Sequence, residues 1–432
     1  MTRLDDIPFL FVRPRYHNGQ WAIMNPIRNV NYTVDYANYS ILKLCDGYRT
    51  FAEIAEELDR SGHSSAERLI SDSGSLLGVL SADGMLWWRQ QRMNRRQMSP
   101  PTSIIWELTD RCNLSCRHCA VDANHQGNGE LNLDECINLI NDMASIGVER
   151  IVMTGGEPLI RSDFFEIAQE CVQKNLHTQV ATNATLVTKE IAQELADLRI
   201  DAQVSLDGAT PNVHELIRQG SGSWSATIRG IKHLVEAGVR VTIATLLVKY
   251  NIHEIIPIVD LIGALGAYRF RLLPFLRLGR GALLTDFEVH PIDVQALVAR
   301  LLKLRSETHV QIASMEFECT FDRPSRSQTD PETPIGCDGA RQYCTITSSG
   351  DVLPCSFFRG ASADNVKDQG FGRIWRNSRF LNYFRSLTVS DIKGKCQQCE
   401  WLFDCRGGCV AANYLEGDIF QSNVRCWLNN IE

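Results

Sequence analysis

The chain reads DRCNLSCRHC from Asp110 to Cys119, which spaces Cys112, Cys116 and Cys119 as C-x3-C-x2-C. Three thiols so close together, with no even pairing among them, are a poor disulfide pattern and a good metal pattern. Iron–sulfur clusters are held by cysteine thiolates, usually four to a [4Fe–4S] cube. Three protein ligands leave one iron open to a group that is not protein, so we expect the centre of the chemistry here.

The overall composition is that of an ordinary globular protein. Hydrophobic residues make up 44% of the 432 positions and charged residues 22%, and no apolar run approaches the ~18 residues that span a bilayer. The N-terminus lacks the basic-then-apolar layout of a signal peptide, so we expect a cytoplasmic protein without a membrane partner. A net charge of −7 disfavours nucleic acid as a partner, because nucleic-acid binding usually comes with a basic patch.

Fifteen cysteines in a reducing compartment are poor candidates for disulfides. Cys45, Cys136 and Cys171 fall inside amphipathic helical patterns, and we expect them to be small core residues. Cys319 belongs to no spacing pattern. The last hundred residues hold eight more, which with the triad make eleven candidate ligands in two groups: Cys337, Cys344, Cys355, Cys396, Cys399, Cys405, Cys409 and Cys426.

Residues 1–90 have the pattern of a small α+β unit. The expected strands are Phe9–Tyr16, Gln20–Asn25, Asn31–Val34 and a last short strand at Trp87 and Trp88. The expected helices are Ala37–Leu44, Thr50–Leu58 with Thr50 as N-cap, and Ser65–Asp83. His17-Asn-Gly between the first two strands is a hairpin signal. Residues 91–101, polar and basic with a Pro-Pro end, are the expected linker.

Residues 102–305 alternate short β-branched runs with amphipathic helical patterns. The strand candidates are Ile104–Leu108, Arg150–Met153, His177–Thr182, Ala202–Leu206, Arg240–Leu247 and Arg269–Leu273. The helix candidates include Leu133–Ser145, Ser162–Lys174, Lys189–Leu195, Ser223–Ala237 and Ile252–Leu265. Six βα repeats predict an α/β fold whose parallel sheet curls into a partial (β/α)6, TIM-like barrel. Residues 306–432, rich in turns and cysteines, are expected to need metal in order to fold.

Polar and glycine-rich motifs follow several of these strands. They are Thr154-Gly-Gly-Glu-Pro158, Thr182-Asn183 and Ser205-Leu-Asp207-Gly208. Ligands of parallel barrels gather at the carboxyl ends of the strands, where these motifs would meet the cysteine triad. Glycines allow the backbone to approach a ligand closely, and exposed backbone groups at a strand end suit a charged amine.

On these residues the chain resembles the radical S-adenosylmethionine (SAM) enzymes, including a ring-bearing residue, His118, before the last cysteine. The resemblance implies a [4Fe–4S] cluster that binds SAM through its open iron, followed by reductive cleavage to methionine and a 5′-deoxyadenosyl radical. It implies that Gly155, Gly156 and Glu157 hold the SAM amino group. It also implies that Asn183, Ser205 and Asp207 lie near the ribose or methionine end, while Arg218 pairs with the carboxylate.

The sequence departs from the family pattern at one position, and several of the proposed site residues are also compatible with purely structural roles. Ala184 occupies a position where many relatives have glycine, which weakens the assignment of Asn183. His118 is also compatible with a surface loop, Asp207-Gly208 with a simple turn, and Arg218 with a solvated helix charge.

The C-terminal cysteines resemble the SPASM extension of peptide- and protein-modifying radical SAM enzymes. The resemblance implies one auxiliary [4Fe–4S] cluster on Cys337, Cys344, Cys355 and Cys409, and a second on Cys396, Cys399, Cys405 and Cys426. With the triad, these make three [4Fe–4S] clusters. The C-x2-C spacing also fits a pair of zinc sites.

The N-terminal unit is similar to the PqqD-like winged-helix recognition element of ribosomal-peptide biosynthesis. That resemblance implies a precursor peptide whose leader adds as a strand to a sheet edge, with Asn31–Val34 as the expected edge. A merely structural cap is the alternative. Winged helices also bind DNA, but the acidic balance of this unit argues against it.

The sequence therefore predicts a radical SAM peptide maturase that cross-links its substrate through a C–C, C–O or C–S bond. Its expected partners are the precursor peptide and an electron donor such as flavodoxin or ferredoxin. The alternatives are oxidation of a protein side chain, decarboxylation or oxidation of a tetrapyrrole side chain, and a non-catalytic electron carrier. No proton acceptor is predicted, although Cys319, Asp322 and Asp338 lie near the domain junction.

Overall fold

The computed structural model describes most of the chain. The described residues are 7–10, 12, 14–17, 20–25, 30–47, 49–61, 70–82, 85–89, 99–123, 129–313, 330–359 and 363–426. Cys319, Asp322 and nearly all of the expected linker lie outside them. In the described part of the chain, no helix is both long enough and apolar enough to cross a membrane.

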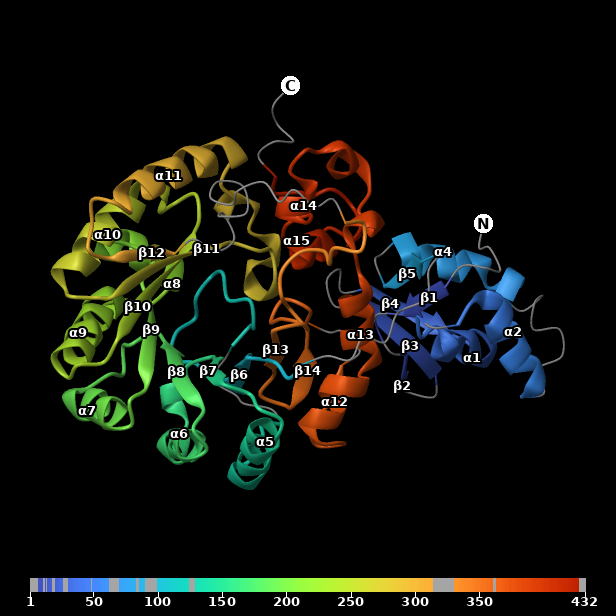
Figure 1. The fold of residues 1–432 in the computed structure, drawn as a ribbon, viewed down its shortest axis with the longest axis horizontal. Coiled ribbons are helices and arrows are strands. Elements are labelled where there is room, and N and C mark those ends of the chain that lie inside the picture. Colours follow the sequence, from blue (N-terminus) through green and yellow to red (C-terminus); the bar gives the residue numbers. More distant parts are fainter. Residues whose placement is uncertain are drawn as a thin grey trace.

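One ten-stranded sheet forms the centre of the molecule (Figure 1). Its strand order is β12-β11-β10-β9-β8-β7-β6-β13-β14-β15. Its parallel barrel strands confirm the predicted α/β class and lie within a residue or two of the predicted ranges. They are β6 (Ser103–Thr109), β7 (Arg150–Gly155), β8 (His177–Thr182), β9 (Asp201–Ser205), β10 (Val241–Leu247) and β11 (Arg269–Pro274). A further parallel strand, β12 (Gln311–Ala313), extends the sheet past the expected boundary at residue 305.

Helices cover the outer side of these strands. They are α5 (Leu133–Ser145), α6 (Phe164–Gln173), α7 (Lys189–Asp197), α8 (Pro211–Arg218), α9 (Ser223–Glu236), α10 (Ile255–Ala264) and α11 (Pro291–Leu304). Helix α5 shows why they form: Asn132 and Glu135 make a reciprocal capping box, and one apolar face, including Cys136, is buried. Cys45, Cys136 and Cys171 are all core residues, as predicted.

The C-terminal region continues the barrel sheet rather than standing apart from it. Strand β13 (Tyr343–Ile346) pairs in parallel with β6, and β14 (Asp351–Leu353) and β15 (Asp364–Asn365) follow in antiparallel order. Helices α12 (Phe371–Asn377), α13 (Arg379–Ser386), α14 (Leu402–Cys405) and α15 (Val410–Leu415) complete it.

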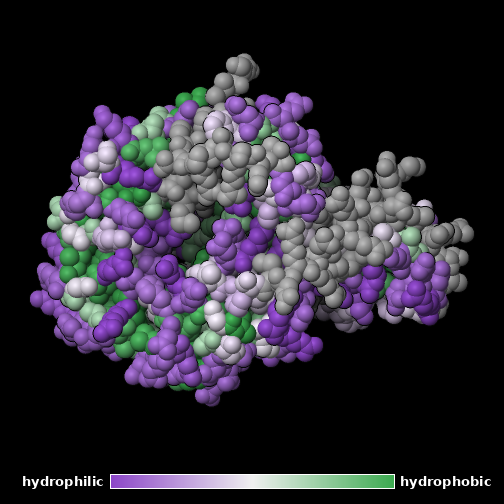
Figure 2. Space-filling model, in the orientation of Figure 1, coloured by the Kyte–Doolittle hydropathy of each residue, from purple (hydrophilic) through white to green (hydrophobic). Residues whose placement is uncertain are grey.

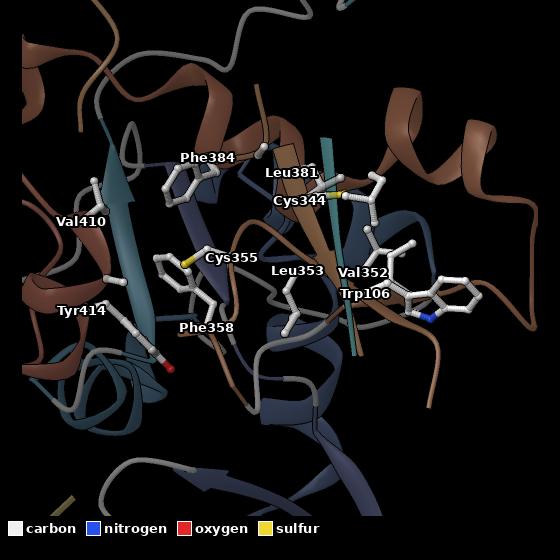
Figure 3. Close-up of a cluster of buried hydrophobic side chains, with 14 of the residues drawn as sticks. Trp106, Cys344, Val352, Leu353, Cys355, Phe358, Leu381, Phe384, Val410 and Tyr414 are labelled. Atoms are coloured by element: carbon white, nitrogen blue, oxygen red, sulfur yellow. The ribbon is translucent and has the colours of Figure 1, made fainter. Parts of the chain in front are cut away.

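Aromatic side chains give this region a substantial apolar core of its own (Figure 3). Phe358 packs against Phe384 at 5.3 Å between ring centroids and against Tyr414 at 5.0 Å. Trp375, Phe380 and Tyr383 are also fully buried or nearly so. The sequence-based expectation that this region depends on metal for folding overlooked these residues, which are scattered along the chain rather than gathered in runs.

The N-terminal unit holds two small sheets and lies beside α13 (Figure 1). Strands β2 (Arg15–His17), β3 (Gln20–Asn25) and β4 (Val30–Val34) form one antiparallel sheet, and β1 (Ile7–Leu10) pairs with β5 (Leu86–Arg89). The predicted single strand Phe9–Tyr16 is therefore wrong, because its two ends belong to different sheets. The helices are α1 (Tyr36–Leu44), α2 (Phe51–Arg60) and α4 (Gly74–Ala82).

Two contacts explain the position and the local structure of this unit. Phe9 stacks on Tyr383 of α13 at 4.2 Å between ring centroids, which fastens the unit to the C-terminal region. Thr50 caps α2 in a capping box with Glu53, as predicted. Figure 2 shows the same orientation as a surface, polar over much of the barrel and hollowed near the centre of the molecule.

Candidate functional site

The cysteine triad lies on the loop that follows β6. Backbone amides point at two of its sulfurs: Leu114 N–H lies 3.5 Å from Cys112 Sγ and Ala123 N–H 3.3 Å from Cys119 Sγ. Burial, together with the nearby Glu157, Cys116 and Cys119, raises the pKa of Cys112 to about 11, although the Leu114 N–H opposes the rise. The three thiols therefore face a common space, and their N–H···S contacts suit thiolates that carry an iron–sulfur cluster.

The Gly155-Gly156-Glu157 turn packs directly against the start of this loop. Gly156 N–H donates to Thr109 O at 2.7 Å, and Glu157 N–H donates to Arg111 O at 2.8 Å. Gly155 has φ +130°, and a Cβ at Gly155 or Gly156 would collide with the backbone of Thr109 or Arg111. Glycine is required at both positions because two backbones meet here without room for a side chain.

The side chain of Glu157 is used inside the protein. Its fully buried carboxylate accepts hydrogen bonds from Thr182 Oγ1 and Asn183 N–H, both at 2.7 Å, and from Leu159 N–H at 3.2 Å. These contacts join the loops after β7 and β8. Any contact of Glu157 with a SAM amino group is therefore left to its backbone.

Asn183 is tied to the cluster loop itself. Its Nδ2 donates to Asn113 Oδ1 at 2.8 Å, and its Oδ1 accepts from Thr185 Oγ1 at 2.6 Å. Asn113 Nδ2 in turn donates to Thr185 Oγ1 at 2.8 Å, which closes a ring of three side chains. Ala184 has φ +58°, in the left-handed region that glycine adopts more readily than alanine.

Asp207 and Arg218 form a buried ion pair beside the triad. Arg218 Nε donates to Asp207 Oδ2 at 2.6 Å, and Asp207 Oδ1 accepts from Leu246 N–H at 2.8 Å. Arg218 Nη1 lies 4.0 Å from Cys116 Sγ. Burial opposes ionisation of Asp207, yet the Arg218 guanidinium holds the pKa of that carboxyl below its usual range. Asp207 thus orients Arg218 instead of turning its carboxylate toward a ligand.

The remaining predicted residues lie close by. Burial and, to a smaller extent, the Arg218 charge lower the pKa of His118 to about 4, so its imidazole is neutral at pH 7. Its Nδ1 is buried and has no hydrogen-bond partner among the described residues. Ser205 ends β9 and is partly exposed between buried Val204 and Leu206, which places it on the inner side of the sheet.

Sequence reasoning missed Arg280 and Glu107. Arg280 Nε donates to Cys116 O at 2.9 Å, so a residue that follows the last barrel strand, β11, holds the cluster loop. Glu107 of β6 is 1% exposed and pairs with Arg359 of the C-terminal region. Glu107 could have been singled out from the sequence, because it is a charged residue inside an apolar strand. No feature of the sequence distinguishes Arg280 in the same way.

Three of the C-terminal cysteines converge around Tyr343. The Tyr343 hydroxyl lies 3.4 Å from Cys337 Sγ. Burial raises the pKa of the Tyr343 phenol, and the neighbouring thiols of Cys337, Cys355 and Cys409 raise it further. The backbone agrees with this grouping, because Gly336 N–H donates to Arg406 O at 2.7 Å and thereby brings Cys337 beside the Cys409 segment.

Cys344, which was predicted to be a ligand of the same cluster, does not point toward this group. Successive residues of a strand point to opposite faces, so Cys344 and Tyr343 of β13 diverge. Cys344 is fully buried in the apolar core, near Leu381 and away from Cys355 (Figure 3). Burial raises the pKa of its thiol, and no other cysteine contributes to that shift.

The other C-terminal cysteines come from neighbouring segments. Cys399 N–H donates to Cys396 O at 3.1 Å, and Cys396 N–H donates to Ser422 Oγ at 2.9 Å. This second contact brings the segment of Cys426 beside Cys396. No disulfide joins the cysteines of the described part of the chain, and no three His, Cys, Asp or Glu side chains there are arranged to hold a single metal ion.

Two sequence families match the chain. The radical SAM superfamily matches residues 106–262, which hold the triad, the glycine turn and Arg218. An iron–sulfur cluster-binding domain, SPASM, matches residues 337–400, which hold five of the C-terminal cysteines.

Curated relatives and solved structures agree with these families. An AdoMet-dependent heme synthase of Methanosarcina barkeri is 32% identical over 341 residues, covering 76% of this chain and 96% of the relative. A mycofactocin maturase, MftC, of Mycobacterium tuberculosis is 30% identical over 331 residues, covering 74% and 81%. Streptococcus suis SuiB bound to its precursor peptide SuiA covers 97% of this chain and 100% of that chain, with a TM-score of 0.66 at 17% identity, and so shares the fold.

The donor set around the triad suits a [4Fe–4S] cluster and SAM, and the family matches support both cofactors. With a relative above 30% identity that covers most of both chains, the family is established. The chain belongs to the radical SAM superfamily and is a radical SAM enzyme with a SPASM domain.

Proposed function

We propose that this enzyme modifies a ribosomally made precursor peptide and closes a cross-link within it. The observation that carries the proposal is the outer edge of β4. This strand pairs with β3 on one side only, and in the described part of the chain no strand covers its other side. An uncovered edge presents unpaired backbone groups, to which an extended peptide can add as a further strand.

Exposed apolar side chains occur on each strand of this small sheet and at the start of the following helix. Tyr16, Met24, Val30 and Tyr36 are 64%, 45%, 40% and 68% exposed, and all lie on β2, β3, β4 or the start of α1. Trp21 of β3 stacks on Tyr39 of α1 at 3.7 Å between ring centroids, which joins the sheet to this helix. Exposed apolar groups gathered on one small sheet are typical of a docking surface.

The residues at the carboxyl ends of the barrel strands would bind SAM, and the substrate would bind in the interior of the barrel. Cluster and SAM together supply one-electron chemistry that removes a hydrogen atom from the substrate. Arg218, held by Asp207, would meet the SAM carboxylate, and the Gly155-Gly156 backbone would meet its amine. Closing a cross-link leaves one electron and one proton to remove; two auxiliary clusters in the C-terminal region would take the electron, and the proton would leave to solvent. A flavodoxin or ferredoxin would supply the reducing electron.

The relatives also favour a second candidate, a tetrapyrrole side chain as substrate. A heme synthase is 32% identical to this chain and is covered over 96% of its own length. This alternative gives the β4 edge no role. The two candidates therefore differ in whether the N-terminal unit takes part in turnover.

A matched pair of variants tests the peptide reading. Val30→Asp places a charge on the β4 edge, whereas Val79→Asp does so at a similarly exposed position on α4 (40% against 44% exposed). We expect Val30→Asp to weaken binding of the precursor peptide about tenfold or more, and Val79→Asp to leave it unchanged. Binding is measured by fluorescence anisotropy with a labelled peptide encoded beside the gene. Equal affinities for both variants, together with turnover of a tetrapyrrole, would support the second candidate.

A further inference from the structure

One buried carboxylate lies between the two cysteine-bearing regions. Glu107 of β6 is 1% exposed and forms an ion pair with Arg359 of the C-terminal region. Its Oε1 accepts from Arg359 Nη2, whereas its Oε2 is buried and has no hydrogen-bond partner among the described residues. A buried carboxylate oxygen without a partner costs free energy. This oxygen is therefore open to a group that the protein itself does not supply.

The register of the sheet turns Glu107 toward the interior of the barrel. Its neighbour Trp106 shares a face of the sheet with Cys344, and both lie in the apolar core (Figure 3). Successive side chains of a strand point to opposite faces, so Glu107 points away from this core. It pairs with the partly exposed Thr154 of β7, and the register then shifts between Glu107 and Thr109. Such irregularities often re-aim side chains beside active sites.

The two halves of the expected chemistry lie on either side of Glu107. Its pairing partner on β7 directly precedes the glycine turn that would meet the SAM amine. On the other side, Arg359 Nε donates to Ser356 O at 2.9 Å, and Ser356 follows Cys355, an expected ligand of the first auxiliary cluster. A substrate that gives a hydrogen atom on one side and an electron on the other must lie between them, beside Glu107.

We propose that Oε2 of Glu107 accepts the proton that the substrate loses when the cross-link closes. The inference rests on the proposed function. One substrate carbon first loses a hydrogen atom to the radical derived from SAM and then bonds to a second substrate atom. The hydrogen of this second atom leaves as an electron, which the oxidised auxiliary cluster accepts, and as a proton, which forms an O–H bond on Glu107.

Arg359 prepares Glu107 for this step. Burial raises the pKa of Glu107, and the charge of Asp110 raises it too, whereas the Arg359 guanidinium and the Ser356 hydroxyl oppose the rise. The ion pair therefore favours the carboxylate, which is the form that accepts a proton. The Arg359 side chain is 21% exposed, so the pair reaches solvent, to which the proton then passes.

The test uses the full-length enzyme with its clusters and a candidate precursor peptide made of deuterated residues. Glu107→Gln keeps the size of the side chain but removes its ability to accept a proton at neutral pH. Glu130→Gln is the matched control, because Glu130 is also partly buried and accepts from Thr109 Oγ1, at the end of the same strand, at 2.6 Å. Iron content and peptide binding, the latter by fluorescence anisotropy, should match the unchanged enzyme in both variants.

The expected signature is hydrogen abstraction without cross-linking. Glu107→Gln should still transfer deuterium from the peptide to 5′-deoxyadenosine, while cross-linked peptide per 5′-deoxyadenosine falls at least about a hundredfold. Its product formation should rise about tenfold per pH unit, because hydroxide replaces the missing acceptor. Glu107→Asp should restore part of the product, and Glu130→Gln should leave the ratio within about threefold of the unchanged enzyme.

Two results would overturn the inference alone. The first is cross-linking by Glu107→Gln within about threefold of the unchanged enzyme. The second is loss of deuterium transfer together with product, because Glu107 would then position the peptide instead of accepting its proton. If the unchanged enzyme itself leaves the peptide at its original mass, the proposed function fails, and this inference fails with it.

Discussion

The two cysteine-bearing regions of this protein are assembled in different ways. The triad comes from one loop, and its neighbours in space follow the next barrel strands in order. The first C-terminal group instead draws Cys337, Cys355 and Cys409 from three separate segments. Spacing along the chain is therefore enough to propose the ligands of the first region. In the second region, the direction in which each side chain points from its strand also determines which cysteines can share a cluster.

The largest expected difference between the regions concerns SAM cleavage. Cys116→Ala removes an expected ligand of the cluster that binds SAM, so 5′-deoxyadenosine formation should fall at least about a thousandfold, to background. Cys355→Ala removes an expected ligand of a proposed auxiliary cluster and should leave SAM cleavage within about tenfold of the unchanged enzyme while product formation is lost. Chromatographic measurement of 5′-deoxyadenosine checks both; an equal loss in the two variants would contradict the division of labour.

The buried ion pair beside the triad should dominate the stability of that region. Asp207→Ala leaves Arg218 buried without its carboxylate, which should cost about 3–5 kcal/mol of unfolding free energy. Glu56→Ala removes the partner of an exposed pair with Arg60 and should cost less than about 1 kcal/mol. Urea denaturation measures both. A cost for Asp207→Ala no greater than that of the surface control would show that the pair does not organise the site.

The barrel region should also lose stability in acid through His214. Burial lowers its pKa to about 4 from an ordinary value near 6.5, so the unfolded chain binds a proton more readily than the folded one. The contribution of His214 to the free energy of unfolding is therefore complete above pH 6.5, and it falls by about 3 kcal/mol as the pH drops to 4. His214→Gln should flatten the dependence of the urea midpoint on pH between these values. An unchanged slope would place the acid sensitivity elsewhere.

The smallest expected effect belongs to Cys344. As a core residue it should tolerate Cys344→Ala with a loss of about 1 kcal/mol and a full complement of iron. Cys355→Ala should instead lose about four iron atoms. Iron assays on the two purified variants check this contrast, and equal iron loss would return Cys344 to the ligand set.

The barrel could be predicted from sequence because its signals are local. Period-two and period-3.6 patterns located β6–β11 and most of their helices, and the motifs fell at the strand ends where the fold brings them together. The functions of Glu157 and Asn183 could not be predicted in this way. Only the folded arrangement of the loops shows that Glu157, through Thr182, joins the loops after β7 and β8, while Asn183, through Asn113, braces the cluster loop.

The C-terminal region was harder for a physical reason. Its core is made of aromatic residues such as Phe358 and Tyr414 that lie far apart in the sequence, so no periodic hydrophobic pattern predicts this core. Cysteine spacing gave Cys344 the same weight as its neighbours. Side chains alternate between the two faces of β13 because this strand pairs with β6, so Tyr343 and Cys344 point in opposite directions. The spacing of the cysteines along the chain cannot reveal this pairing.

The mass of a precursor peptide tests the central claim most directly. A candidate precursor peptide encoded beside the gene is incubated with SAM and the reduced full-length enzyme and is then analysed by mass spectrometry. Our account predicts the loss of two hydrogen atoms and an intramolecular cross-link, formed by the unchanged enzyme but by neither Cys116→Ala nor Cys355→Ala. A peptide of unchanged mass, in an assay where the same enzyme converts a tetrapyrrole, would contradict it.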